Sequence, residues 1–246
     1  MSGAPPLLEV KGLNKAFGGI VAARDLHFSV AEGEIMGLIG PNGSGKTTVI
    51  NLLSGELGAD AGEIRLKGRD IAGLSPHRIC RERVSRTFQL VRIMPGMTVA
   101  ENVMLAGMFG SRRAAVGTAH AAALELVERV GLADKADTPA SVLTYIDQKR
   151  VELARALATG PMLLLLDEWL AGLNPAELEI GMDLVARTRA DGMSVILVEH
   201  VMHAVRKLSD RIVVMNAGVK VIEGGPEEVL SHPEVVRVYL GGDRDA

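Results

Sequence analysis

Uninterrupted apolar runs are the clearest pattern along this chain. Residues 35–39, 163–166, 194–198 and 211–215 each form a run with the length of a buried strand. A helical pattern over residues 176–190 separates the second run from the third. Apolar strands that alternate with helices are typical of a parallel sheet covered on both faces. The pattern therefore predicts an α/β fold.

Two other patterns interrupt this alternation. Residues 7–33 and 63–66 alternate between apolar and polar positions in short β-like runs, which predicts an antiparallel β part near the N-terminus. From about residue 95 to residue 160, apolar positions such as Val99 and Val103 recur at helical spacing in an alanine-rich background. We therefore expect a single domain over residues 1–246, with a helical subdomain over 95–160 inserted in it.

A glycine-rich loop follows the first apolar run and matches the pattern G-x-x-x-x-G-K-[ST]. Its glycines allow a tight turn that points successive backbone N–H groups at a phosphate, and the following helix adds its positive end. Lys46 can then reach the β- and γ-phosphates, and the Thr47 hydroxyl can hold Mg²⁺. The nucleotide-binding candidates are Gly40, Pro41, Asn42, Gly43, Ser44, Gly45, Lys46, Thr47 and Thr48. The loop predicts a P-loop core that binds a nucleoside triphosphate together with Mg²⁺.

Polar side chains follow two of the apolar runs. Asp167 and Glu168 come directly after residues 163–166, and Glu199 and His200 follow residues 194–198. Ligands bind at the carboxyl ends of strands in open parallel sheets. Asp167 can coordinate Mg²⁺ there, Glu168 can orient the attacking water, and His200 can contact the γ-phosphate. Solvated strand ends and a surface histidine are the alternatives, and the phosphate loop argues against them.

Composition excludes several other classes of function. The 246 residues are 48% hydrophobic and carry a net charge of −3, so there is no general electrostatic case for nucleic acid. The single cysteine, Cys80, excludes an internal disulfide. No run approaches the ~18 apolar residues that a membrane helix needs. We therefore expect any membrane role to come through a partner.

With these residues the chain resembles the ATP-hydrolysing subunits of ABC transporters, over positions 8–240. The phosphate loop is similar to the Walker A motif of that family, and residues 163–168 are similar to its Walker B strand with Glu168 as the catalytic carboxylate. The resemblance implies the ABC ATPase fold, a Q-loop glutamine at Gln89, and Phe17 stacked on adenine, although a Phe beside a turn also fits a core position. The metal ligands implied are Thr47, Gln89 and Asp167.

The signature motif departs from the family pattern. It normally reads Leu-Ser-Gly-Gly-Gln or Leu-Ser-Tyr-Gly-Gln, and in the family it contacts ATP bound by the opposite subunit. This chain has Leu143, Thr144, Tyr145, Ile146, Asp147 and Gln148 there. Ile146 replaces a glycine that permits close backbone approach, and the Asp147 carboxylate would oppose a bound anion. Thr144 and Asp147 also fit a capping box, which would explain them as helix-start residues.

These departures suggest an asymmetric dimer in which this chain completes its partner's site poorly. In the alternative, Ile146 and Asp147 point away from the nucleotide, and Thr144 and backbone groups make the contacts. A further departure is Trp169, which stands where the family usually has proline.

Finer features are similar to the ATPases of branched-chain amino acid importers, with urea and amide importers sharing much of the pattern. They lie in residues 88–94, 97–103, 171–175 and 232–240. The resemblance implies permease subunits, a second identical or similar ATPase subunit, and indirectly a periplasmic solute-binding protein as partners. It places the chain at the cytoplasmic face of the inner membrane. The alternatives are a soluble ABC-type ATPase in assembly or repair, and an ATP-dependent clamp with little hydrolysis.

Overall fold

A six-stranded sheet carries the four apolar runs side by side. The computed structural model describes residues 5–111 and 116–240, and the strand order of this sheet is β10-β9-β3-β8-β7-β6. All neighbours are parallel except β9 and β10, which form an antiparallel edge. The strands are β3 (Ile35–Ile39), β6 (Val84–Arg86), β7 (Leu163–Asp167), β8 (Ser194–Val198), β9 (Arg211–Asn216) and β10 (Val219–Gly224). Every residue of β3, β7 and β8 is buried, which confirms the mostly parallel sheet.

A second sheet forms the N-terminal β part. It is antiparallel, with the order β2-β1-β4-β5. Its strands are β1 (Leu8–Phe17), β2 (Ile20–Val30), β4 (Ala61–Leu66) and β5 (Arg69–Asp70). The predicted antiparallel β part is therefore confirmed, and residues 8–30 form two long strands, β1 and β2, whose pairing is interrupted by register shifts.

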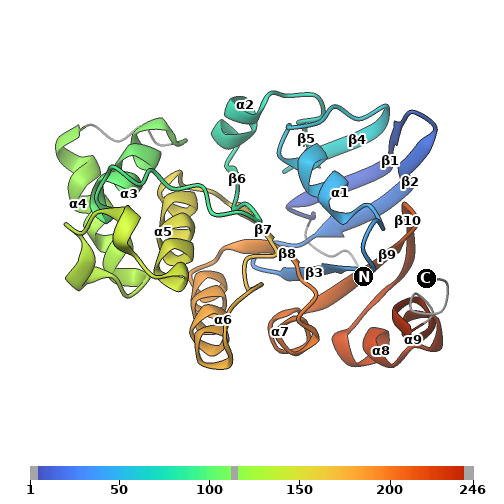
Figure 1. The fold of residues 1–246 in the computed structure, drawn as a ribbon. Coiled ribbons are helices and arrows are strands. Elements are labelled where there is room, and N and C mark those ends of the chain that lie inside the picture. Colours follow the sequence, from blue (N-terminus) through green and yellow to red (C-terminus); the bar gives the residue numbers. More distant parts are fainter. Residues whose placement is uncertain (1–4, 112–115, 241–246) are drawn as a thin grey trace.

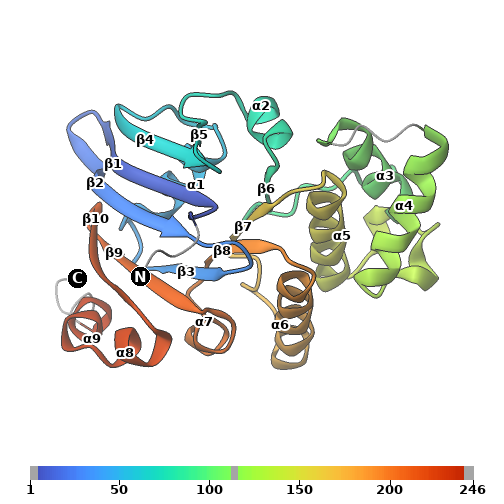
Figure 2. The same ribbon diagram turned by 180° about the vertical axis from the view of Figure 1, so that it is seen from behind.

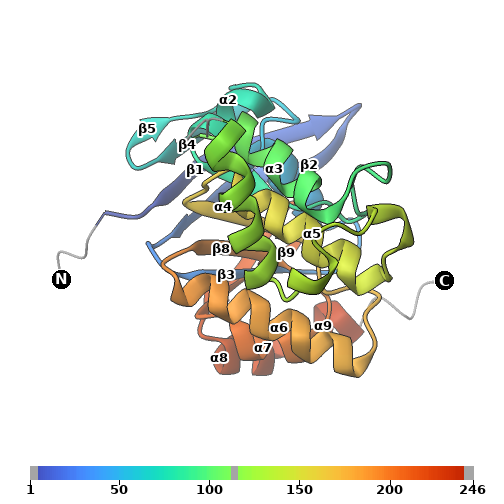
Figure 3. The same ribbon diagram turned by 90° about the vertical axis from the view of Figure 1, so that its left-hand side faces the viewer.

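Helices cover both faces of the six-stranded sheet (Figure 1). Helix α1 lies between the two sheets, and α6 to α9 lie together on the opposite face (Figure 3). The core follows these layers, because one cluster of buried side chains joins α1 to both sheets and another joins α6 to the outer face. These helices, with α2 at the edge, are α1 (Lys46–Leu53), α2 (Pro76–Arg81), α6 (Pro175–Ala190), α7 (Met202–Leu208), α8 (Pro226–Ser231) and α9 (Pro233–Leu240).

Residues 95–160, which we call the helical region, stand at one side of the molecule, away from the antiparallel sheet (Figure 2). Its elements are α3 (Val99–Phe109), α4 (Val116–Arg129), two 3₁₀ turns (Ala133–Lys135 and Ala140–Val142) and α5 (Tyr145–Ala158). Val99, Val103 and Val127 are fully buried, as the helical spacing predicts. Thr98 and Glu101 form a capping box at the start of α3.

The phosphate loop joins the buried end of β3 to α1. The backbone of Gly45 has φ = 105°, and a Cβ atom placed there would lie 2.1 Å from the carbonyl oxygen of Ala22 on β2. Gly43 also has a positive φ, 75°, but a Cβ atom there would meet nothing within 4 Å. The Gly218 amide also donates to the Ser44 carbonyl at 3.0 Å. The loop is therefore fixed on both sides by backbone.

Exchanging each of these two glycines for alanine separates the cost of a left-handed backbone from the cost of a steric clash with β2. Gly43→Ala should lower the free energy of unfolding by about 1–2 kcal/mol, the usual cost of a left-handed backbone for a residue with a Cβ. Gly45→Ala should cost clearly more, because the methyl group collides with the Ala22 carbonyl and no side-chain rotation relieves it. Urea unfolding of the two variants checks this. Equal losses would contradict the close approach of β2 to the loop.

Candidate active site

The ends of β7 and β8 meet at the candidate site. Asp167 pairs with Val198 in the sheet, and the Glu168 amide then donates to the Val198 carbonyl at 2.9 Å. Glu168 has φ = 49°, a left-handed backbone that costs a non-glycine residue energy and recurs at functional sites. The Gln89 side-chain amide donates to Glu168 Oε2 at 2.8 Å. Two predicted site residues that are 79 positions apart thus lie in direct contact.

Asp167 is held by Arg86, which the sequence analysis had assigned no role. Arg86 Nη2 lies 3.0 Å from Asp167 Oδ2, and the same guanidinium donates to Asn51 and Ser54. Burial raises the pKa of the Asp167 carboxyl, and the charge of Arg86 opposes that rise. The ion pair therefore keeps a buried carboxylate available at the end of β7.

Lys46 closes the opposite side of the site. Its ammonium group donates to the carbonyl oxygens of Gly40 and Pro41 at 2.8 and 2.9 Å. Burial lowers its pKa, while the negative charges of Glu168 and Asp167 oppose that shift. Lys46 is therefore a buried cation between the phosphate loop and the strand-end carboxylates.

The three predicted metal ligands share one cavity. Thr47, Gln89 and Asp167 all line a cavity of about 290 Å³ beside Arg86. Their hydroxyl, amide and carboxylate oxygens are ligands that Mg²⁺ accepts when phosphate and water complete its shell, so the donors fit the ion. Within residues 5–111 and 116–240 there is no cluster of three His, Cys, Asp or Glu side chains that would hold a metal without a nucleotide.

The other predicted residues lie apart from this contact network. His200 is exposed between β8 and α7, and Phe17 is exposed to 44%, so it does not occupy a core position. The Lys15 ammonium lies 5.5 Å from the centre of the Phe17 ring. Among the described residues, neither Phe17, His200 nor the signature segment forms a hydrogen bond or ion pair with the phosphate loop. Their roles toward a nucleotide stay predictions.

The signature segment opens α5, and its Asp147 faces inward. Thr144 is the N-cap and accepts from the Asp147 amide, which is half of the expected capping box. The Asp147 carboxylate is 3% exposed and pairs with Lys135 at 2.5 Å and with Arg150 at 3.1 Å. The other half of the box is therefore absent. These ion pairs support the alternative in which Asp147 points away from the nucleotide.

Two buried carboxylates hold the backbone beside the site, and the sequence analysis did not assign this role to either of them. Glu152 on α5 accepts from the amides of Phe88 and Arg92 at 3.2 and 3.3 Å, on either side of the segment that carries Gln89. Glu199 accepts from the Leu170 amide at 2.6 Å. The available signal was a glutamate inside the apolar face of a helix and another directly after a buried strand.

Sequence comparisons agree with this geometry. Residues 23–171 match the ABC transporter family, and residues 223–245 match the branched-chain amino acid ATP-binding cassette transporter family. The chain is 41% identical over 250 residues to the high-affinity branched-chain amino acid transport ATP-binding protein BraF of Pseudomonas aeruginosa. It is 42% identical to the corresponding LivG protein of Escherichia coli K12. Both alignments cover 96% of this chain and 98% of the relative.

Solved structures give the same result for the fold. The crystal structure of the ADP conformation of an ATP-binding cassette of an ABC transporter superposes with a TM-score of 0.87 and 30% identity. It covers 97% of this chain and 100% of its own. A nucleotide-free ATP-binding cassette superposes with a TM-score of 0.86. The predicted ABC ATPase fold is therefore confirmed, and the chain belongs to the ABC transporter family, with ATP-binding proteins of branched-chain amino acid transport among its relatives.

Proposed function

We propose that this chain is the ATPase subunit of an importer that carries branched-chain amino acids. The observation that carries the proposal is the contact between Gln89 and Glu168 beside Asp167 and Lys46. The substrate class is supported by the relatives, whose names give branched-chain amino acid transport, and by the match over α8 and α9.

In this proposal each group has one task in hydrolysis. Lys46 and the amides of the phosphate loop bind the β- and γ-phosphates, while Glu168 and Gln89 orient the attacking water. Thr47, Gln89 and Asp167 hold Mg²⁺, which supplies positive charge against the phosphates. His200 contacts the γ-phosphate from the end of β8, and Phe17 stacks on the adenine ring. Because the strained backbone of Glu168 is fixed before substrate binds, its carboxylate is already oriented.

A second ATPase subunit completes the site. The Thr144 hydroxyl and the Tyr145 ring are exposed at the start of α5, where a partner's nucleotide would meet them. Ile146 follows them in the sequence, but its side chain is buried and only 8% exposed. Since the Asp147 charge is compensated by Lys135 and Arg150, the proposal of an asymmetric dimer rests on Ile146 alone.

The remaining partners are membrane proteins. Among the described residues no helix has both the length and the apolar character to cross a bilayer. We infer that permease subunits hold the chain at the cytoplasmic face of the inner membrane and that a periplasmic solute-binding protein delivers the solute to them. The helical region and the loop that carries Gln89 lie side by side and form the part that would face the permease (Figure 1).

Glu168→Gln tests the catalytic assignment. The variant should keep MgATP binding but hydrolyse ATP roughly 10²–10⁴-fold more slowly, the usual contribution of a general base. Lys46→Ala should instead weaken binding, measured with a fluorescent ATP analogue. Glu128→Gln, on the exposed face of α4, is the control and should behave as the unmodified protein. Unchanged ATP turnover in Glu168→Gln would contradict the assignment of Glu168 as the catalytic carboxylate.

Ile146→Gly and Asp147→Asn separate the two explanations of the signature segment. Ile146→Gly should raise the ATP turnover of the assembled transporter if bulk limits the approach of the partner's nucleotide. Asp147→Asn should lower the free energy of unfolding by about 1–3 kcal/mol, because Arg150 and Lys135 lose a buried partner. Turnover and chemical unfolding measure the two effects. A faster Asp147→Asn enzyme of unchanged stability would restore the electrostatic explanation.

Capture from native membranes tests the partners. Tagged chain purified in mild detergent should recover hydrophobic permease subunits, and its ATP hydrolysis should rise in their presence. A chain with full activity that recovers only soluble proteins would favour the role in assembly or repair.

A further inference from the structure

Three buried ionisable side chains lie behind Glu168, outside the cavity that would hold nucleotide and metal. Lys149 is fully buried, Glu199 is 1% exposed and Glu152 is 4% exposed. Lys149 and Glu152 belong to α5, and Glu199 directly follows β8. Buried charges are costly unless they are paired, so such a group needs a compensating role.

The turn that carries Glu168 is held by the Glu199 side chain and by the backbone of Lys149. Glu199 Oε1 accepts from the Leu170 amide at 2.6 Å, two residues beyond Glu168. The Trp169 indole donates to the Lys149 carbonyl at 3.1 Å, and its ring is fully buried. The turn itself contains the left-handed backbone of Glu168. Glu199 thus fixes Leu170 through its carboxylate, whereas Lys149 fixes Trp169 through its backbone carbonyl, a contact that does not depend on the lysine charge.

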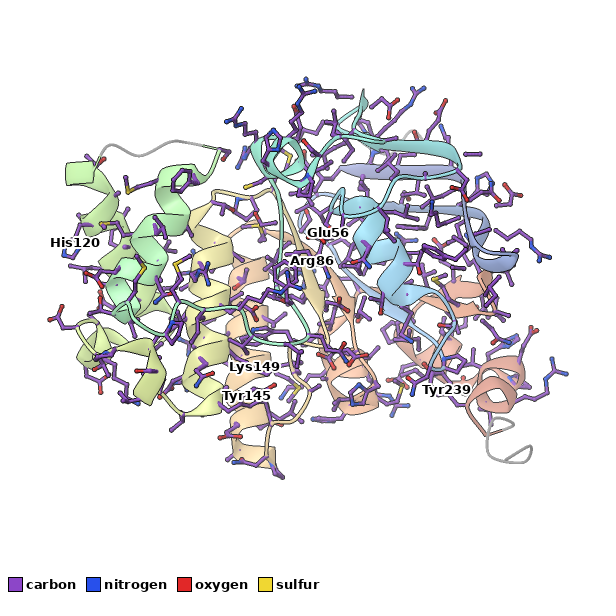
Figure 4. All side chains as sticks on the ribbon, turned by 45° about the horizontal axis from the view of Figure 1, so that its top comes forward. Glu56, Arg86, His120, Tyr145, Lys149 and Tyr239 are labelled. Atoms are coloured by element: carbon purple, nitrogen blue, oxygen red, sulfur yellow. The ribbon has the colours of Figure 1, made fainter. Side chains whose placement is uncertain are left out.

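Among the described residues no direct ion pair joins Lys149 to Glu199, but the lysine charge is near enough to act on the carboxyl. Burial raises the pKa of Glu199 to about 7, while the Leu170 amide and the Lys149 ammonium group hold it down. Glu168 on the adjoining turn raises it further, and the His200 amide lowers it. Neither Lys149 Nζ nor Glu199 Oε2 has a hydrogen-bond partner among the described residues, and Nζ lies 5.0 Å from the centre of the Tyr145 ring. Figure 4 shows Tyr145 and Lys149 together where α5 meets the rest of the molecule.

We propose that Glu199 and Lys149 are positioning residues for ATP hydrolysis, acting as a buried charge pair that holds the Glu168 turn in its strained conformation. The inference rests on the proposed function of Glu168. Attraction between the two charges keeps the Glu199 carboxylate on the Leu170 amide.

Two near-isosteric substitutions remove the charges. Glu199→Gln keeps an oxygen that can accept from Leu170, and Lys149→Met keeps the length of the side chain. In steady-state ATP hydrolysis by the purified full-length chain at pH 8, each should lower kcat at least tenfold and leave KM within twofold. The exposed pair Glu179 and Lys207, 2.8 Å apart, provides matched controls in Glu179→Gln and Lys207→Met, which should leave both constants unchanged.

The double variant Lys149→Met/Glu199→Gln shows whether the two residues act together. For a pair, its kcat should be no lower than that of the slower single variant, whereas independent effects multiply. It also removes both charges of the pair together, and Glu152 keeps its contacts with the amides of Phe88 and Arg92, so the double variant serves as the folded variant if a single substitution prevents folding. In that case a kcat at least tenfold below that of the unmodified chain supports the positioning role, and an unchanged kcat overturns it.

The pH profile distinguishes positioning from mere stability. Ionised Glu199 attracts Lys149, so kcat of the unmodified chain should rise as pH increases through about 7. Lys149→Met removes a charge that favours ionisation, so the remaining rise should move to higher pH. Glu199→Gln should lose this rise and approach the unmodified rate toward pH 6.

Glu168→Gln separates failure of this inference from failure of the proposed function. If Glu168→Gln is inactive but the charge variants match the unmodified chain at every pH, the positioning role is overturned and the catalytic assignment stands. If Glu168→Gln is fully active, the proposed function itself fails.

Discussion

The hydrogen bond between the Glu168 amide and the Val198 carbonyl joins the ends of β7 and β8, and the candidate site depends on it. It turns the chain out of the sheet directly after Asp167, so that successive carboxylates face different partners. Asp167 meets Arg86, and Glu168 meets Gln89. A regular continuation of β7 would place neighbouring side chains on opposite faces of the sheet. The left-handed turn therefore brings both acids to the same edge.

Helix α5 contacts the surroundings of this edge at several points. Glu152 holds the backbone at Phe88 and Arg92, and the Lys149 carbonyl accepts from Trp169. Asp147 fastens the start of the same helix to Lys135 in the helical region. A single rigid helix thus touches the segment carrying Gln89 and the turn carrying Glu168. The replacement of the usual proline by Trp169 fits this arrangement, because the indole fills the space against α5.

Local patterns predicted the sheet and the phosphate loop, because apolar runs and glycine spacing depend on near neighbours in the sequence. The partners of buried charges were not predictable in this way. Arg86 and Asp167 are 81 residues apart, and Leu170 and Glu199 are 29 apart, so only the folded chain pairs them. Asp147 is the clearest case, since its place in the motif suggested a charge beside phosphate. Lys135 and Arg150 instead hold its carboxylate in the interior.

The clamped phosphate loop has a consequence for the thermodynamics of nucleotide binding. Gly45 lies against the Ala22 carbonyl, and Gly218 joins Ser44 to Arg24 through its amide and carbonyl. A loop held from two sides has little conformational entropy left to lose when a ligand arrives. Little of the binding free energy of ATP is then needed to order the loop. The remainder can contribute to the association of two ATPase subunits.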